Sequence, residues 1–259
     1  MKNISVGIST VFPNLDRAKS LAAEVLTQGK EGLIHEVVIV CQRCPEPFTD
    51  LGGGRLKVLG VTDAGLSKSR NLVLQSASGD FVWFLDDDVT VTNGSLEAIS
   101  SVGGDVDVLL GQIGCSDGPG FYKNYQRKAV LPFALLRVSS IELIVNRRKM
   151  LERNIFFDER LGLGAQYPCG EENAFLLDLY RSGARFEWLE QVIVYHPCGG
   201  SEVRDYFRTE SQMYARGVVA SKFGFLRGGL LCVYWSLRVL RKPASFKLVF
   251  SMLRGFLKG

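Results

Sequence analysis

Short apolar runs and amphipathic stretches alternate along most of the chain. The apolar runs are rich in Val, Ile, Leu and Phe, as in strands that are buried on both faces of a sheet. They predict strands at residues 4–10, 36–41, 56–59, 81–85, 106–110, 141–145 and 191–195. Apolar residues at helical spacing predict helices at residues 15–27, 66–76, 94–100, 147–153, 171–182 and 202–223. This alternation indicates an α/β fold of βαβ units around a mostly parallel sheet.

Three segments between these elements lack periodicity and are predicted to be loops: residues 44–54, 111–120 and 161–170. Residues 111–120 contain four glycines and one proline. A loop of this composition is free to move, so we expect it to become ordered when substrate binds.

The last part of the chain has a different pattern. Residues 226–240 are apolar but contain Arg227 and Arg238, and their uninterrupted apolar core is shorter than the ~20 residues of a membrane span. Residues 246–257 place apolar side chains on one helical face and Lys247, Arg254 and Lys258 off it. This pattern is typical of a helix that lies in a membrane interface. Packing of these helices on the body, or in a dimer, is the alternative.

Charge divides the chain at about the same place. The net charge is +4, from 31 basic and 27 acidic residues. No acidic residue follows Glu210, whereas nine basic residues do, so residues 1–210 hold 22 basic and 27 acidic residues, a charge of about −5. We therefore predict a domain at residues 1–217 and a basic amphipathic helical tail at residues 218–259, whose partner is an anionic membrane surface.

Composition places the protein among folded domains. Hydrophobic residues make up 46% of the chain, enough for a large core. The start MKNISVGIST leads directly into a strand, so we expect no signal peptide and six reduced cysteines. The pair Cys41-x-x-Cys44 lacks a second pair or matching histidines, so we do not expect a zinc site.

The stretch FVWFLDDDVTV at residues 81–91 is the main candidate for chemistry. A buried strand ends at three consecutive carboxylates, Asp86, Asp87 and Asp88, and ligands bind at the carboxyl ends of strands in open α/β sheets. Adjacent anions repel one another, so a divalent metal ion is the simplest partner. A solvated acidic loop is the alternative, but such loops seldom follow so hydrophobic a strand.

Three further clusters fall at strand ends or helix starts. Residues 63–71, DAGLSKSRN, combine a glycine turn and a helix start with Lys68 and Arg70, which can contact phosphate oxygens. Glu171 and Glu172 open a helix after a glycine loop, where a carboxylate either compensates the helix dipole or acts as a general base. His196, one of two histidines, ends a strand and can complete the coordination of a metal bound by Asp88.

Together these clusters resemble the nucleotide-sugar-dependent glycosyltransferases of family 2, which have the GT-A fold. The resemblance covers roughly residues 3–217 and is carried by the segments ISVGISTVFPN, DAGLSKSRN, FVWFLDDD, GEEN, VYHPCGGS and MYARG. FLDDD is similar to the family's D-x-D signature, and GLSKSRN is similar to its G-x-S-x-A-R-N segment.

The resemblance implies a role for each candidate residue. Asp88, together with His196, would bind Mn²⁺ or Mg²⁺ on the donor diphosphate, and Glu172 would be the catalytic base with Glu171 as its rival. The nucleotide-sugar contacts would be Thr10, Pro13, Gln42, Asp63, Gly65, Arg70, Asn71, Asp86 and Asp87. Gln42 stands where the family usually has a base-reading aspartate, so the base of the donor stays open.

The implied activity is a metal-dependent, hexosyltransferase-type transfer from a nucleoside-diphosphate sugar to a hydroxyl. One base and no assignable nucleophile predict inversion at the anomeric carbon. The implied acceptor is a glycan or a lipid-linked glycan of surface polysaccharide assembly. We therefore expect a cytoplasmic protein that is peripheral on the inner face of the cell membrane.

Two other classes fit the carboxylates and the α/β pattern less well. A nucleotidyltransferase acting on sugar phosphates usually has a basic glycine-rich loop after its first strand, and residues 10–14 have neither feature. A non-catalytic nucleotide-sugar-binding protein would have lost Glu171 and Glu172 or the aspartates. We expect no nucleic acid binding, since the basic residues accompany apolar helices and no aromatic–basic strand platform is visible.

Overall fold

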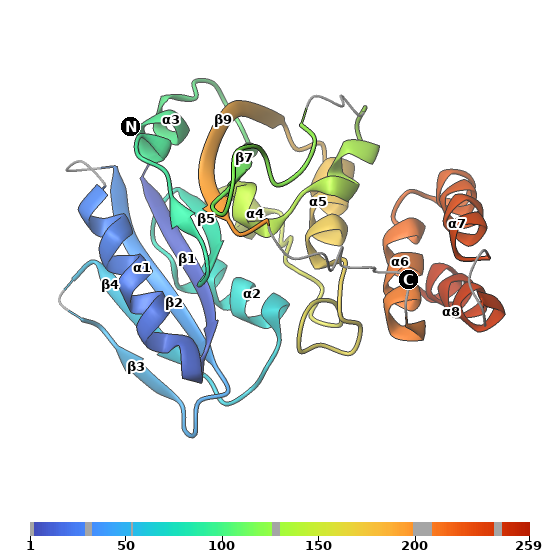
Figure 1. Ribbon diagram of the computed structural model, residues 1–259, viewed down its shortest axis with the longest axis horizontal. Coiled ribbons are helices and arrows are strands. Elements are labelled where there is room, and N and C mark those ends of the chain that lie inside the picture. Colours follow the sequence, from blue (N-terminus) through green and yellow to red (C-terminus); the bar gives the residue numbers. More distant parts are fainter. Residues whose placement is uncertain (1–2, 29–32, 53, 126–129, 199–208, 241–244) are drawn as a thin grey trace.

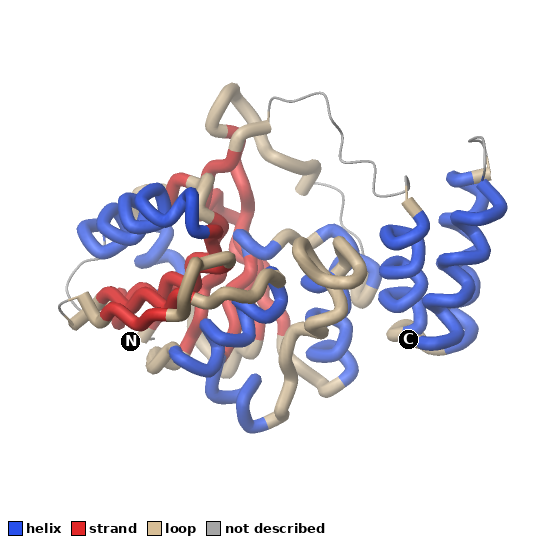
Figure 2. Tube along the Cα trace, turned by 90° about the horizontal axis from the view of Figure 1, so that it is seen from below, coloured by secondary structure: helices blue, strands red, loops and turns tan. Residues whose placement is uncertain are grey.

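A computed structural model describes residues 3–28, 33–52, 54–125, 130–198, 209–240 and 245–259 (Figure 1). These residues form an α/β body and a group of three helices, α6 to α8, at one side of it. The body is built on a nine-stranded sheet with the order β3-β4-β2-β1-β5-β8-β7-β9-β6. Figure 2 shows the strands as a central layer with helices outside it.

The first half of the sheet is parallel and has the predicted strands. Strands β1 (Ile4–Val11), β2 (Ile34–Gln42), β4 (Leu56–Gly60) and β5 (Phe81–Asp86) pair in parallel in the order β4-β2-β1-β5. Their side chains alternate between the two faces. Phe81, Trp83 and Leu85 pack into one core, whereas Val82 and Phe84 pack into the other. Parallel pairing brings the carboxyl ends of these strands to one edge.

The second half of the sheet is mixed. Strand β8 (Leu143–Asn146) runs antiparallel between β5 and β7 (Val108–Cys115), and β7 pairs in parallel with β9 (Phe186–His196). Two short strands close the edges by antiparallel pairing, β3 (Phe48–Asp50) on β4 and β6 (Thr90–Val91) on β9. The end of β9 therefore returns to the edge at which the parallel strands end.

Helices cover both faces of the sheet. Helices α1 (Leu15–Gln28) and α3 (Ser95–Ser101) pack on one face, and α2 (Leu66–Ser76), α4 (Arg147–Glu152) and α5 (Glu171–Arg181) pack on the other. Three single-turn 3₁₀ helices, η1 (Phe12–Asn14), η2 (Phe133–Arg137) and η3 (Ser140–Glu142), lie in the connections. Helix α2 has the bounds predicted from sequence, and α1, α3, α4 and α5 lie within one residue of theirs at each end.

Three predictions about strands and loops are wrong. Residues 48–50, predicted as loop, form β3. Residues 111–115, also predicted as loop, continue β7, where Gly111 and Gly114 leave room for the side chains of Ile193 and Tyr195 on β9. Strand β9 begins at Phe186 rather than at residue 191. In each case pairing with a neighbouring strand outweighs the weak local β pattern.

Helices α6 (Glu210–Ser221), α7 (Phe225–Val239) and α8 (Ser245–Lys258) share a separate small core that includes Met213, Trp235 and Met252. Thr209 caps α6 through a capping box with Gln212. The earlier part of the helix predicted from residue 202 lies outside the described residues. Among the described residues, no helix is long and apolar enough to cross a membrane. The domain boundary at residue 217 stays a prediction.

Glycines allow these three helices to approach closely. A Cβ atom at Gly217 of α6 would overlap the backbone carbonyl of Met252 in α8, and one at Gly228 of α7 would overlap the carbonyl of Ala220. A Cβ atom at Gly229, the next residue of α7, would meet no atom within 4 Å outside the adjacent helix backbone. Close helix packing, rather than helix propensity, therefore requires glycine at the first two positions.

Gly217→Ala and Gly229→Ala should change stability in opposite directions. Alanine at residue 229 should raise the free energy of unfolding by about 0.5–1 kcal/mol through helix propensity alone. Alanine at residue 217 should lower it by about 1–3 kcal/mol, because the backbones of α6 and α8 must move apart. Urea denaturation of both variants provides the measurement. Equal stabilisation by both changes would show that α6 and α8 do not pack this closely.

Candidate functional site

A cleft of about 480 Å³ opens at the carboxyl edge of the sheet. Its walls include Thr10 at the end of β1, Gln42 at the end of β2, and the aspartates that follow β5. Glu172 at the start of α5 and His196 at the end of β9 complete it from the second half of the sheet. The fold thus brings together residues from five elements, as expected for the carboxyl ends of strands in an open α/β sheet.

The three aspartates have different partners. Asp87 accepts hydrogen bonds from Thr10 and from Arg17, which lies in the first turn of α1. Asp86 faces Arg70, with 3.5 Å between Oδ1 and Nη2. Asp88 faces His196, with 3.7 Å between Oδ1 and Nε2. Arg17, Thr10 and Arg70 therefore offset the charges of Asp86 and Asp87, whereas among the described residues Asp88 has only the imidazole of His196 as a partner.

His196 is oriented toward Asp88 by its own backbone neighbour. Its Nδ1 lies 2.8 Å from the carbonyl oxygen of Pro197, and a carbonyl only accepts, so Nδ1 carries the proton. In the neutral ring, Nε2 then presents its lone pair on the side of Asp88. The ring of Tyr122 packs edge-on against His196 at a centroid distance of 5.1 Å. Hydrogen bonding at the distal nitrogen is the usual support of a metal-binding histidine.

Arg70 connects the two sides of the cleft. It is only 1% exposed, and besides Asp86 its guanidinium lies 3.3 Å from both Glu171 and Glu172. The side chain of Glu171 is 6% exposed and that of Glu172 is 19% exposed, and only Glu172 lines the cleft. The ring of Phe157 lies 5.7 Å from the guanidinium carbon. One buried cation thus fixes three carboxylates that come from β5 and α5.

The charged groups of this cluster shift one another's pKa values. Burial, followed by repulsion from Glu172, raises the pKa of Glu171 to about 7 against the attraction of Arg70. Desolvation also raises the pKa of Asp86, with Arg70 opposing the shift and Asp88 and Glu172 adding to it. For Arg70, burial acts to lower the pKa, but the attraction of Glu172, Asp86 and Glu171 outweighs it and raises the pKa. Arg70 therefore keeps its positive charge and interacts with all three carboxylates.

The remaining candidates from the sequence occupy supporting positions. Gln42 accepts a hydrogen bond from the backbone N–H of Gly65 at 2.7 Å and also lines the cleft. Asn71 is buried and binds the backbone of Phe157 in both directions, which anchors the loop before α5. Asp63 is exposed and pairs with Lys68 beside an adjoining hollow of about 370 Å³. Pro13 is exposed in η1 and does not line the cleft.

Several cleft residues had no signal in the sequence. Tyr122, Ser139 and Leu163 come from connections with no motif, and Arg17, which pairs with Asp87 beside the cleft, lies on a solvated helix face. Only the tertiary fold brings them to the aspartates. The sequence predicts Arg70 as a phosphate contact; in the structure it is buried among three carboxylates and does not line the cleft.

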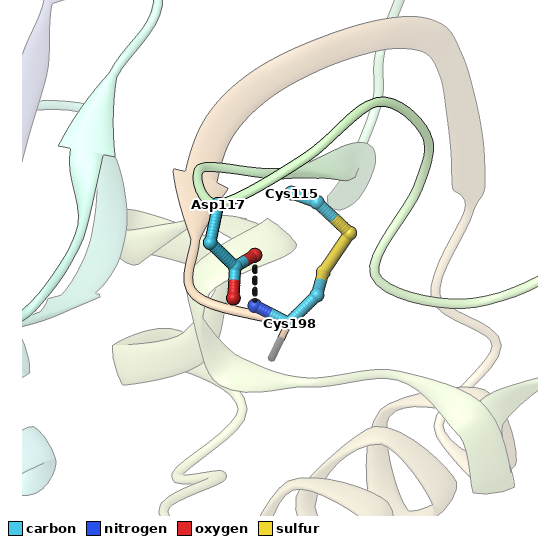
Figure 3. A group of neighbouring side chains, drawn as sticks. All are labelled: Cys115, Asp117 and Cys198. Atoms are coloured by element: carbon cyan, nitrogen blue, oxygen red, sulfur yellow. Dashed lines mark hydrogen bonds between the residues drawn. A yellow bond between two sulfur atoms is a disulfide. The ribbon is translucent and has the colours of Figure 1, made fainter. Parts of the chain in front are cut away.

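The expectation of six reduced cysteines is wrong. Cys115 at the end of β7 and Cys198 after β9 form a disulfide, with Cα atoms 5.2 Å apart (Figure 3). The parallel register of β7 and β9 pairs Cys115 with His196, which brings Cys198 within reach. Asp117 accepts a hydrogen bond from the Cys198 backbone N–H at 2.8 Å. The other described cysteines, Cys41, Cys44, Cys169 and Cys232, are free thiols.

Comparisons with known proteins agree with this geometry. Residues 42–163 match the family described as Glycosyl transferase family 2. No curated protein sequence matches the chain significantly. Among solved structures, residues 1–349 of TarS from S. aureus align with a TM-score of 0.62 and 19% identity, over 98% of this chain and 70% of that one.

Two other structures of TarS give the same result. The 1–349 fragment in complex with UDP-GlcNAc aligns with a TM-score of 0.61 and 20% identity, over 85% of this chain and 66% of that one. Another TarS structure aligns with a TM-score of 0.61 and 21% identity, over 84% of this chain, and the match spans 39% of that longer chain. Residues 42–163 are thus similar to glycosyltransferase family 2, and the chain has a fold similar to that of TarS, in agreement with the GT-A fold predicted from the sequence.

Replacing Arg70 should destabilise the protein strongly. Arg70→Met leaves Asp86, Glu171 and Glu172 without their cation, which should lower the free energy of unfolding by about 3–5 kcal/mol. The loss should be larger at pH 8 than at pH 5, because protonation at low pH removes the unpaired negative charges. Chemical denaturation at both pH values provides the measurement.

Arg148→Met is the matched control. Arg148 is 74% exposed and pairs with Asp80 on the surface, so its loss should cost about 0–1 kcal/mol at either pH. Equal losses in the free energy of unfolding for Arg70→Met and Arg148→Met would contradict the description of Arg70 as a buried cation shared by three carboxylates.

Proposed function

We propose that the protein transfers a sugar from a nucleoside-diphosphate sugar to a hydroxyl of a glycan or lipid-linked acceptor, with inversion at the anomeric carbon. One observation carries the proposal: Asp86, Asp87 and Asp88 face Glu172 across one cleft, and Arg70 joins the two sides. A role in surface polysaccharide assembly is part of the same proposal and rests on the family resemblance alone.

The donor is assigned to the side of the cleft formed by β1, β2 and β5. The similar TarS fragment has been solved in complex with UDP-GlcNAc and with UDP, which makes uridine nucleotides the first donors to examine. Thr10 and Gln42 lie at the ends of β1 and β2, where the nucleotide would enter. The amide of Gln42 is fixed by Gly65 and is a neutral group for reading the base.

The residues present fit a divalent metal ion such as Mn²⁺ or Mg²⁺. A carboxylate of Asp88 beside the lone pair of His196 is a donor set suited to these ions. Asp86 instead faces Arg70, and Asp87 is held by Thr10 and Arg17. When bound, the ion would offset the negative charge that develops on the leaving diphosphate.

Glu172 is the proposed catalytic base. It lines the cleft, so it can accept a proton from an acceptor hydroxyl, whereas Glu171 is buried against Arg70. The contact of 3.3 Å between Arg70 and Glu172 orients the carboxylate. Among the described cleft residues, no second carboxylate stands on the Glu172 side to act as a nucleophile, which favours direct displacement and inversion.

We call helices α6 to α8 the helical appendage, and it is the proposed membrane-binding part of the protein. Large apolar side chains of α7 and α8 are exposed: Phe225, Leu226, Leu230, Val233, Tyr234, Leu237, Phe246, Phe250, Leu253 and Leu257. No acidic residue follows Glu210 in the sequence, and Arg227, Arg238, Lys247, Arg254 and Lys258 lie on the same two helices. Apolar side chains surrounded by basic groups complement an anionic lipid surface. Attachment to the cytoplasmic face of the cell membrane is the proposed location.

Substitutions of Asp88 and of Glu172 should have different effects: the first should weaken donor binding, and the second should lower turnover. Calorimetry with a panel of nucleotide sugars and Mn²⁺ should show binding to the wild-type protein, at least tenfold weaker binding to Asp88→Ala, and loss of binding after chelation. Glu172→Gln should bind the donor normally, while turnover falls by at least a hundredfold.

Glu171→Gln is the control for the base, and it should retain more turnover than Glu172→Gln. Full turnover of Glu172→Gln, with loss in Glu171→Gln, would reverse the assignment. Failure of every nucleotide sugar to bind the wild-type protein would overturn the proposed function.

Membrane binding should depend on the exposed face of α8. The wild-type protein should sediment with vesicles of equal parts phosphatidylglycerol and phosphatidylcholine, and less with phosphatidylcholine alone. A Phe246→Ser, Phe250→Ser double variant should lower the partition constant by about tenfold or more, because two inserted aromatic side chains are lost.

Leu51→Ser, which removes an exposed apolar side chain from the body, is the matched control and should sediment as the wild type does. If the wild-type protein instead forms a dimer without lipid and ignores the vesicles, the exposed face is an interface between copies and the membrane proposal fails.

A further inference from the structure

Gln42 is a nearly buried side chain with one polar group that no described residue satisfies. It stands at the end of β2 and is 7% exposed. It lines both the cleft of about 480 Å³ and the adjoining hollow of about 370 Å³. The side chain therefore forms part of the wall that these two spaces share.

A backbone group fixes the orientation of the Gln42 amide. Gly65 donates its N–H to Oε1 of Gln42 at 2.7 Å, and only the oxygen of an amide group can accept such a bond. The nitrogen Nε2 therefore occupies the opposite position. The two segments are also joined directly, because Val61 donates to the carbonyl of Cys41 at 2.8 Å and Cys44 donates to that of Val61 at 2.9 Å. The amide is thus held in one orientation.

Nε2 of Gln42 is left as an unused donor. Within the part of the chain that the structure describes, no group accepts a hydrogen bond from it. The buried side-chain atoms without a partner are Oε1 of Gln28 and Oγ of Ser95, so Nε2 is not cut off from solvent. A donor in so enclosed a position gains free energy when a ligand supplies an acceptor. A ligand at this wall should therefore present an acceptor to Gln42.

Arg43 supplies further donors beside this amide. It follows Gln42 in the chain and lines the same cleft, and no described residue accepts from its guanidinium. An arginine side chain has five N–H donors and no acceptor. In the adjoining hollow, the carboxylate of Asp63 is 74% exposed and already pairs with Lys68. Two neighbouring side chains of the wall thus offer donors only.

The four common bases differ in the order of donors and acceptors along their pairing edges. Cytosine presents two adjacent acceptors, N3 and O2, beside its amine. Uracil presents O4, N3–H and O2, so a donor separates its two acceptors. Guanine places N1–H and an amine beside O6, and adenine places N1 beside an amine. Cytosine alone therefore offers two adjacent acceptors to two neighbouring donors.

We propose that Gln42 and Arg43 select a cytidine nucleotide, so that the sugar donor is a cytidine diphosphate sugar. This rests on the proposed glycosyl transfer and names the base of its donor. Nε2 of Gln42 would donate to N3 of the base, and the guanidinium of Arg43 would donate to O2. A uracil in the same place would set its N3–H against Nε2–H, and both donors would lose their partners.

The proposed base separates this chain from its structural neighbour. The TarS fragment was solved in complex with UDP-GlcNAc and with UDP, whereas the amide of Gln42 opposes the N3–H of uracil. Specificity of this kind is strong, because a site built from fixed hydrogen-bonding groups rejects a ligand that leaves those groups unpaired.

Calorimetry on the full chain with Mn²⁺ compares CDP with UDP. The wild-type protein should bind CDP about tenfold or more tightly, because UDP leaves the amide donor unpaired. A third probe, 3-deaza-CDP, carries C–H in place of N3 and should lose most of the advantage of CDP over UDP. This probe needs no substitution in the protein, so its result does not depend on the folding of a variant.

Gln42→Glu changes the donor into an acceptor with almost no change of shape. One carboxylate oxygen keeps the bond from Gly65, and the other replaces Nε2. At pH 8 this variant should bind UDP more tightly than CDP. Gln75→Glu is the matched control, since Gln75 is exposed on α2 and lines neither space, and it should keep the preference for CDP.

A wild-type protein that binds UDP as tightly as CDP would overturn the inference. Equal binding of CDP and 3-deaza-CDP would also overturn it, and so would a folded Gln42→Glu variant that still prefers CDP, because the base would then be read by other groups. Tight UDP binding without a preference for CDP leaves the proposed function intact. Absence of binding by every nucleotide, in contrast, removes the proposed donor site itself.

Discussion

The ion cluster around Arg70 is the interaction on which the rest of the site depends. One buried guanidinium satisfies Asp86 from the donor side and Glu171 and Glu172 from α5. Burying the charge of Arg70 is costly unless oppositely charged groups surround it, and the buried carboxylate of Glu171 would be costly without this cation. The cluster therefore links α2, β5 and α5 at the cleft by electrostatics as well as by apolar packing.

This arrangement follows from the order of the strands. Parallel pairing brings the ends of β1, β2 and β5 to one edge, and the antiparallel strand β8 then connects them to β7 and β9. Because β9 runs parallel to β7, it ends at the same edge, with His196 facing Asp88. The proposed metal-binding pair thus comes from residues more than one hundred positions apart, without any local sequence motif that joins them.

Sequence patterns predicted most of the fold, and the structure brings several of the predicted site residues into one cleft. Apolar runs buried on both faces identify strands such as β2 and β5, because their burial requires no knowledge of partners. Short edge strands such as β3 are stabilised by pairing and carry little local signal. The same limit applies to Arg17, which reaches Asp87 only after α1 packs on the sheet, and to the pairing of Cys115 with Cys198. The roles of individual site residues stay predictions.

The disulfide between Cys115 and Cys198 turns part of the chain into a covalent ring. Its two ends are 83 residues apart, and this interval contains Glu171, Glu172 and His196 but none of the three aspartates. In chain-entropy terms, closing a loop of that size removes about 4–5 kcal/mol of freedom from the unfolded state. A backbone cut within the ring would therefore leave one covalently joined molecule, and Glu172 and His196 would remain tethered to the rest of the protein.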